Sequence, residues 1–148
     1  MPELPEVETT CRGIEPLISG AVITDVVVRN YSLRWPVPGD INVILANQTI
    51  IGITRRAKYI LFKLTKGTLI MHLGMSGNLR ILDHNTPHAK HDHVDIVLSN
   101  GKTLRFNDAR RFGSIHWTTD NINQHKLLAH LGIEPLTEEF DVEFLLNA

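Results

Sequence analysis

Residues 49–82 have the sequence TIIGITRRAKYILFKLTKGTLIMHLGMSGNLRIL, and this stretch decides the fold class. It contains four short segments rich in β-branched, aromatic and other apolar residues, separated by basic or glycine-containing turns. Short segments with this composition and these boundaries are typical of β-strands. The predicted strands are 49–54, 59–64, 68–73 and 78–82.

The sequence on either side of this stretch continues the pattern. Further strands are predicted over 22–29, 94–98, 103–106 and 114–117, and Asn100-Gly101 between two of them is a strong hairpin signal. About eight short strands at this spacing favour a β-sandwich or a flattened barrel.

Helices are expected at both ends of the chain. Apolar residues recur at spacings of three and four over 3–18, which predicts an amphipathic helix, and a short helix is predicted over 41–46. Further short helices are predicted over 124–131 and 142–146. The predicted fold class is therefore α+β and mostly β, with the N-terminal helix packed on the sandwich or barrel and short helices at the C-terminus.

Composition and charge restrict the class of protein. The 148 residues include one cysteine, Cys11, so the chain can form no internal disulfide and no cysteine zinc cluster. No signal peptide and no apolar run near twenty residues is present, so export and a membrane span are not predicted. The net charge is −1, but residues 1–117 carry 14 Lys and Arg against 10 Asp and Glu. Such a basic region can present a phosphate-binding surface despite the acidic remainder.

The beginning of the chain places an amine beside carboxylates. If Met1 is removed, Pro2 has a free secondary amine, a nucleophile that can form an iminium with a sugar C1. Glu3 and Glu6 are three residues apart, so they share one face of the predicted helix and can shuttle protons or orient a substrate. The alternative is a first helical turn in which acidic residues favour the helix dipole.

Two loops combine cations or glycines with unusual side chains. Arg55, Arg56 and Lys58 lie at a strand junction and suit either a phosphate clamp, with Lys58 near a reacting sugar, or a solvated basic turn. In residues 72–77, Met75 lies between two glycines that permit a sharp turn. Its side chain suits either a wedge into a base stack or a position in the core.

Two further loops carry histidine, aspartate and arginine. Residues 90–95 alternate His and Asp, which suits a His–Asp hydrogen-bonded pair better than a metal site, and His91 can also contact phosphate. Residues 107–113 place two arginines beside Phe112, a combination suited to nucleic acid. The alternative is that Phe112 belongs to the core and that one arginine pairs with Asp108. Together, the four loops and the terminal amine describe an enzyme acting on a flipped DNA base.

The same segments resemble bacterial formamidopyrimidine-DNA glycosylase, in the order of that family and from residue 2 to about 140. The matching segments are 2–9, 56–59, 72–77, 90–95 and 110–113. The resemblance implies an N-terminal catalytic β-sandwich domain over 1–134. It also implies a linker and the start of a truncated helical DNA-binding domain over 135–148.

The resemblance implies base-excision DNA repair by a bifunctional DNA glycosylase/AP lyase. Such an enzyme removes 8-oxoguanine and formamidopyrimidines from double-stranded DNA and then cuts the abasic strand by β,δ-elimination. By resemblance, Pro2 is the Schiff-base nucleophile, Glu3 is the catalytic acid and Lys58 assists proton transfer and phosphate binding. Glu6 supports the lesion site.

The resemblance also assigns the contacts with DNA. His91 and Arg110 would bind the DNA backbone or the orphaned base, and Met75, Arg110 and Phe112 would fill the space that the flipped nucleotide leaves. No cofactor is expected in this chain, and zinc is expected in a C-terminal zinc finger of the full-length protein. We expect a monomeric enzyme of the bacterial cytoplasm, associated with the nucleoid.

Three features depart from the family pattern. Ala109 replaces the usual proline before the arginine pair, the helical and zinc-finger parts are missing, and a retained Met1 would block the Pro2 amine. We therefore expect this fragment alone to be inactive. The alternatives are an endonuclease VIII-like glycosylase for oxidised pyrimidines, which usually has glycine at the position of Leu4, and a non-catalytic isolated domain.

Overall fold

The order of helices and strands matches the sequence pattern. The computed structural model describes residues 4–56 and 58–119, with side chains from Val7 onward. Its elements are α1 (Leu4–Ile18), β1 (Ile23–Val28), α2 (Ile41–Leu45), β2 (Ile50–Arg56), β3 (Tyr59–Leu64), β4 (Thr68–His72), β5 (Asn78–Asp83), β6 (Asp92–Leu98), β7 (Lys102–Asn107) and β8 (Ser114–Thr118). The two N-terminal helices and all eight strands are confirmed, with boundaries within two residues of the prediction. The helices predicted over 124–131 and 142–146 lie outside the described residues.

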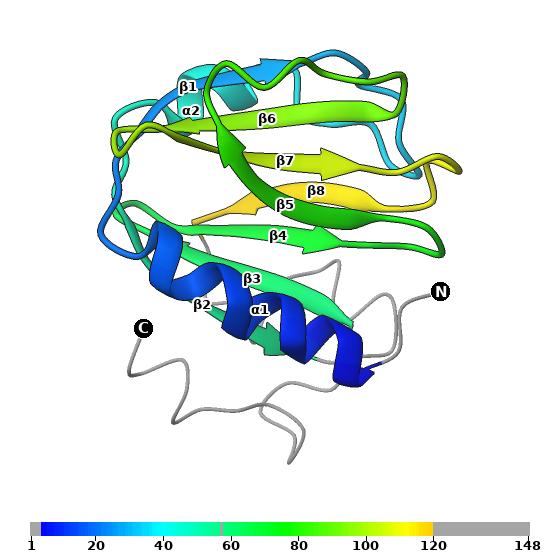
Figure 1. Cartoon of the computed structure of the whole chain (residues 1–148), viewed down its shortest axis with the longest axis horizontal. Coiled ribbons are helices and arrows are strands. Elements are labelled where there is room, and N and C mark those ends of the chain that lie inside the picture. Colours follow the sequence, from blue (N-terminus) through cyan, green and yellow to red (C-terminus); the bar gives the residue numbers. More distant parts are fainter. Residues whose placement is uncertain (1–3, 57, 120–148) are drawn as a thin grey trace.

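The eight strands form two antiparallel sheets. The strand order is β1-β6-β7-β5 in one sheet and β2-β3-β4-β8 in the other. The two sheets lie one above the other in Figure 1 and are not joined into a closed barrel within the described residues. The prediction of a mostly β, α+β fold is confirmed, and of its two variants the sandwich is the one observed.

Apolar side chains from both sheets and from the two helices form one core. The stripe of α1 contributes Val7, Cys11, Ile14 and Ile18, all at most 6% exposed, and Figure 1 shows this helix lying along β2 and β3. Full burial of one such aliphatic side chain stabilises the fold by about 1.5–3 kcal/mol. The helix is therefore held on the sandwich by its apolar face, and its first turn is fixed at one end of the sheets.

Antiparallel pairing brings several connections to that same end. Strands β1, β2, β4 and β7 finish there, and their antiparallel partners β3, β5, β6 and β8 begin there. In Figure 1 this is the right-hand end, where the first residues of α1 also lie. We call it the loop end. It consists of Lys58 and residues 29–36, 73–77, 88–91 and 108–113.

Candidate nucleic-acid interface

Three of the predicted DNA-contacting side chains lie on the two facing loops of the loop end. Met75 is 44% exposed and Phe112 is 46% exposed, although both are apolar. Arg110 lies on the same loop as Phe112, and its Nη1 donates to Met75 Sδ on the facing loop at 3.6 Å. Neither apolar side chain belongs to the core, so the alternative interpretation of both residues as core residues is wrong. Their role in a base stack stays a prediction.

Asp108 joins the two loops that carry these side chains. Asp108 is fully buried, with 0% exposure. Its carboxylate accepts hydrogen bonds from the Ser76 hydroxyl and from the Gly113 N–H, both at 2.7 Å. Ser76 Oγ in turn accepts a hydrogen bond from the Arg110 N–H at 3.1 Å. In the part of the chain that the structure describes, Asp108 forms no ion pair with an arginine, so the alternative interpretation, in which one arginine of its loop pairs with Asp108, is wrong.

Backbone contact at Gly74 brings the same loops close together. Gly74 has φ of +66°, in the left-handed region that glycine adopts without a steric penalty. A Cβ at this position would lie 2.6 Å from Gly113 N and 2.6 Å from the carbonyl carbon of Phe112. Gly74, one of the two glycines that suggested a sharp turn, is therefore also needed for the approach of one loop to the other.

Lys58 lies beside a histidine that the sequence analysis did not select. Tyr59 and His72 are paired across β3 and β4, with ring centroids 4.8 Å apart. His72 Nδ1 accepts the Gly74 N–H at 2.9 Å. Burial lowers the pKa of His72, and the nearby charges of Lys58 and Arg34 lower it further. A neutral His72 with Nδ1 as acceptor can present its other ring nitrogen as a donor.

The basic segment at the end of β2 is only partly available for ligands. Arg55 Nε donates to Glu8 Oε1 at 3.0 Å, which ties β2 to α1. Arg56 is 1% exposed, so its side chain cannot reach a solvent-borne phosphate. The predicted clamp of three cations is therefore wrong for Arg56, whereas Lys58 is half-buried at the loop end.

The two aspartates of the alternating His and Asp residues form ion pairs with arginines. Asp92 and Asp95 are buried and contact Arg80, Arg105 and Arg29, so the expected His–Asp pairing is wrong. His93 instead contacts the Asp108 carbonyl oxygen through Nε2 at 2.7 Å. His91 is half-buried, and its ring lies 6.3 Å from that of His93.

Metal ligands do not cluster in the described residues. No group of three or more His, Cys, Asp and Glu side chains that could hold a metal occurs within residues 4–56 and 58–119. Burial, together with the charge of Glu8, raises the pKa of Cys11 to about 12. A thiol that is protonated and enclosed in the core does not suit zinc, which binds thiolate. The zinc that the resemblance implies is expected in a C-terminal finger of the full-length protein, and it stays a prediction.

The predicted nucleophile and acid lie at the start of the chain. Pro2 and Glu3 lie outside the described residues, and the Glu6 side chain also lies outside them. Their chain neighbours in the first turn of α1 are at the loop end (Figure 1). Of the predicted site residues, the structure thus brings Met75, Arg110 and Phe112 together, with Lys58 and His91 at the same end. It adds His72 and Asp108.

A β-sandwich that presents apolar side chains and cations at one end defines a candidate DNA-binding domain. The sequence model described as the formamidopyrimidine-DNA glycosylase N-terminal domain matches residues 1–115. The chain belongs to the formamidopyrimidine-DNA glycosylase family, which confirms the resemblance.

Curated relatives carry the same name over most of this chain. Formamidopyrimidine-DNA glycosylase of Nitrosococcus oceani is 56% identical over 147 residues, covering 99% of this chain and 54% of that protein. The protein of the same name from Enterobacter sp. strain 638 is 56% identical over 145 residues, covering 98% of this chain and 53% of the relative. The chain thus spans about half the length of the curated relatives that it matches.

Solved structures share the fold. Lactococcus lactis formamidopyrimidine-DNA glycosylase non-covalently bound to DNA with an AP site is similar, with a TM-score of 0.73 and 33% identity over 79% of this chain and 45% of that one. The wild-type L. lactis protein in complex with DNA containing N7-benzyl-Fapy-dG gives a TM-score of 0.76 and 32% identity over 88% and 47% of the two chains. No helix among the described residues is long and apolar enough to cross a membrane.

Proposed function

We propose that this chain supplies the catalytic N-terminal half of a base-excision repair enzyme. The enzyme removes oxidised purines, 8-oxoguanine and formamidopyrimidines, from double-stranded DNA and then cuts the abasic strand by β,δ-elimination. The observation that carries the proposal is the loop end. There, Arg110 contacts Met75, Phe112 is exposed on the same loop as Arg110, and the helix end that follows Pro2 lies at the same end of the sheets. Family membership and 56% identity to enzymes of this name support the same conclusion.

The terminal amine is assigned to the covalent step. Pro2 is two residues before Leu4 in the chain, and an extended chain of this length spans at most about 7 Å. The Pro2 amine is therefore within reach of a nucleotide bound at the loop end. The Pro2 nitrogen forms a bond to C1′ of the sugar while the bond from C1′ to the base breaks, and the base leaves with a proton. The nitrogen then loses its own proton, and cleavage of the bond from C1′ to O4′, with a proton delivered to O4′, opens the sugar and gives the iminium. Glu3 supplies and removes protons in these steps, Glu6 orients the lesion, and Lys58 contacts the phosphate beside the reacting sugar.

The exposed side chains at the loop end are assigned to the DNA. Flipping a nucleotide out of the duplex costs a few kcal/mol of lost stacking and pairing. Met75 and Phe112 are apolar and exposed, so they can occupy the vacated space at little cost to the domain. Arg110 and His91 bind the backbone or the orphaned base. The proposal places the enzyme in the bacterial cytoplasm with the nucleoid, as a monomer whose zinc lies in a separate C-terminal finger.

Borohydride trapping on lesion DNA tests the proposal. We would compare the chain alone with a chimera in which the C-terminal half of the N. oceani relative continues it, each with and without Met1. The chimera lacking Met1 should form a covalent adduct with duplex DNA containing 8-oxoguanine, and both Met1-containing proteins should form none. Glu3→Gln in the chimera should abolish base excision while DNA binding changes by less than about tenfold, or roughly 1.4 kcal/mol.

Three results would contradict the proposal. Trapping that is unchanged after the Pro2 amine is blocked would exclude the assigned nucleophile. A chimera that binds lesion DNA but neither excises the base nor forms an adduct would favour a non-catalytic domain. Excision of oxidised pyrimidines in preference to 8-oxoguanine would instead favour the endonuclease VIII-like alternative.

A further inference from the structure

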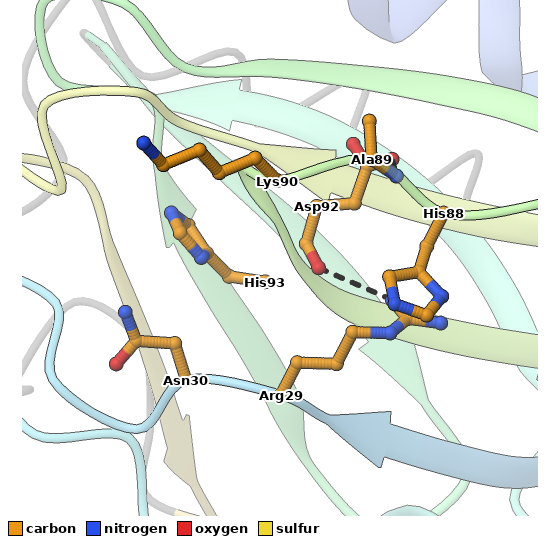
Figure 2. Close-up of a pocket in the computed structure, with 7 residues that line it drawn as sticks. All are labelled: Arg29, Asn30, His88, Ala89, Lys90, Asp92 and His93. Carbon is orange, nitrogen blue, oxygen red and sulfur yellow. Dashed lines mark hydrogen bonds between the residues drawn. The ribbon is translucent and has the colours of Figure 1, made fainter.

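A pocket of about 420 Å³ lies at the loop end, beside the predicted DNA contacts. It is located between the residues that follow β1 and the segment that leads into β6. Figure 2 shows the side chains around it, which come from Arg29, Asn30, His88, Lys90, Asp92 and His93. None of these residues has a role in the function proposed above.

The polar groups around the pocket favour an anion. Lys90 contributes an exposed positive charge, and Arg29 contributes a second that it shares with Asp95. His88 adds an N–H donor, whereas His93 already donates through Nε2 to the Asp108 carbonyl oxygen. Arg29 uses Nη1 for the Asp92 carbonyl oxygen at 3.2 Å and Nη2 for Asp95 at 2.8 Å. A guanidinium has five N–H donors, so these two bonds do not use its full capacity.

The one carboxylate in the pocket wall is already neutralised. Asp92 is 2% exposed, and its oxygens accept hydrogen bonds from Arg80 at 3.0 Å, Asn107 at 2.8 Å and the Ala89 N–H at 2.7 Å. Burial acts to raise the pKa of Asp92, but these bonds and the charges of Arg80 and Arg105 outweigh it, and the pKa is lowered. The negative charge is thus directed away from the pocket and matched by arginines.

The walls of the pocket are fixed by hydrogen bonds. Arg105 donates to the Thr86 and Pro87 carbonyl oxygens at 2.9 and 3.0 Å, which holds the segment just before His88. The Arg29 N–H donates to the His93 carbonyl oxygen at 2.7 Å. A ligand would therefore meet side chains on a backbone that is already in place, which lowers the cost of binding.

The pocket is also connected to the loops that carry the predicted wedges. The His93 ring in its wall contacts the Asp108 carbonyl oxygen, and the Asp108 carboxylate holds Ser76 and Gly113. A DNA backbone that passes over Arg110 can thus continue along the loop end to the pocket.

We propose that this pocket binds a phosphate group, and that the group is a backbone phosphate of the DNA engaged at the loop end. The proposal rests on the function proposed above, because it adds a phosphate contact to that interface. Lys90 and Arg29 supply the charge, and His88 and Asn30 supply hydrogen bonds at the rim. The volume exceeds that of one water molecule, about 30 Å³, by more than tenfold, so a phosphate and part of its sugar fit.

The test compares two substitutions that remove one charge each. Lys90→Gln removes an exposed cation from the pocket, and Lys66→Gln removes an exposed cation from the β3–β4 turn at the opposite end. Both proteins and the unmodified chain are titrated with inorganic phosphate and, separately, with duplex DNA containing an abasic-site analogue. Amide NMR shifts report the site, and binding across a salt series gives the slope of log K against log salt.

We expect inorganic phosphate to shift the amides of residues 29–30 and 88–93 in the unmodified chain and in the Lys66→Gln protein, but far less in the Lys90→Gln protein. Duplex DNA should shift these amides and those of residues 110–112. Loss of one phosphate contact should reduce the salt slope of Lys90→Gln by about 0.9 relative to Lys66→Gln.

Each other outcome overturns the proposal in a distinguishable way. If phosphate binds at the pocket but the two variants have equal salt slopes, the ligand is a free phosphate-bearing molecule and not the DNA backbone. If DNA shifts residues 110–112 while neither phosphate nor DNA shifts 88–93, the pocket is no anion site and the proposed function stands. If DNA shifts neither region, both the inference and the proposed function fail.

Discussion

The carboxylate of Asp108 and the hydroxyl of Ser76 are 2.7 Å apart and link the two loops that hold Met75 and Phe112. The second carboxylate oxygen accepts the Gly113 N–H at the same distance. One buried side chain thus fixes the relative position of the exposed groups assigned to DNA.

Asp108→Ala should destabilise the domain. Each buried donor left without its acceptor costs about 1–3 kcal/mol, so the free energy of unfolding should fall by about 2–6 kcal/mol for the two lost bonds. Chemical denaturation measures the change. Asp40→Ala is the matched control, because Asp40 is exposed and makes no side-chain capping bond, and it should change stability by less than about 0.5 kcal/mol. Equal effects of the two substitutions would contradict the conclusion that Asp108 holds the two loops together.

Phe112→Ala should weaken binding to abasic-analogue DNA while leaving the domain stable. Because Phe112 is 46% exposed, its truncation removes little packing, whereas Phe106→Ala removes a 1% exposed side chain and should cost about 3–5 kcal/mol. Thermal unfolding and fluorescence anisotropy with labelled duplex separate the two effects. If Phe112→Ala is as destabilising as Phe106→Ala, the wedge assignment is wrong.

Gly74→Ala should be more damaging than Gly101→Ala. Both glycines have positive φ, +66° and +84°, so either alanine incurs a backbone penalty of about 1–2 kcal/mol. A Cβ at Gly101 meets open space, whereas a Cβ at Gly74 would collide with the backbone of Phe112 and Gly113. The free energies of unfolding of the two variants give the steric part by difference. No difference between them would show that the loops can separate freely.

His72→Gln should make the stability of the domain less sensitive to mild acid. The folded pKa of His72 lies below its ordinary value of 6.5, so between the two values the unfolded chain binds more protons. The stability from neutral His72 is complete above about pH 6.5 and is lost as the pH falls through the folded pKa. Free energies of unfolding at several pH values test this, with the exposed His88→Gln as the control. An unchanged pH profile in His72→Gln would contradict the assignment.

Asp95→Asn should cost about 3–5 kcal/mol, because it breaks a buried ion pair with Arg105 at 2.9 Å and leaves a buried cation. Burial acts to raise the pKa of Asp95, but the bonds from Arg105 and Arg29 lower it. This contribution is present above the ordinary pKa of about 3.9 and is lost as the pH falls through the lower folded value. Urea unfolding at neutral and acidic pH should show it. Asp83→Asn at an exposed pair should change little, and a comparable loss there would contradict the prediction.

The sequence predicts the strands well because their signals are local. Short β-branched segments and glycine turns fix β2 to β5, and the apolar stripe of α1 fixes the helix. The burial and pairing of charged side chains could not be predicted in the same way. Arg105 pairs with Asp95 because the two residues are opposite each other on β7 and β6, and this register is not evident from either strand alone. Arg56 follows another basic residue and resembles a surface turn, yet the strand places it in the interior.

The residues of the candidate site that belong to a sequence motif could be predicted. The residues whose role depends on tertiary contacts could not. Met75 and Phe112 are unusual in glycine-rich loops, and that contrast selected them. Asp108 and His72 have ordinary neighbours in the sequence, and their importance arises from contacts that the fold makes. Asp108 bonds to Ser76, 32 residues away, and the His72 ring lies against Tyr59 on the neighbouring strand. A glycine at the point of contact, as at Gly74, is the one local signal that could have indicated them.

The turn over 73–77 takes the chain from β4 to β5, and the loop over 108–113 takes it from β7 to β8, so each passes from one sheet to the other. In both cases an inner strand is joined to an edge strand of the opposite sheet. A force that DNA bases exert on Met75 or Phe112 would therefore act on both sheets at once. Bending of a single hairpin could not absorb this force. The two loops are therefore mechanically supported by both sheets, because each has one end in either sheet.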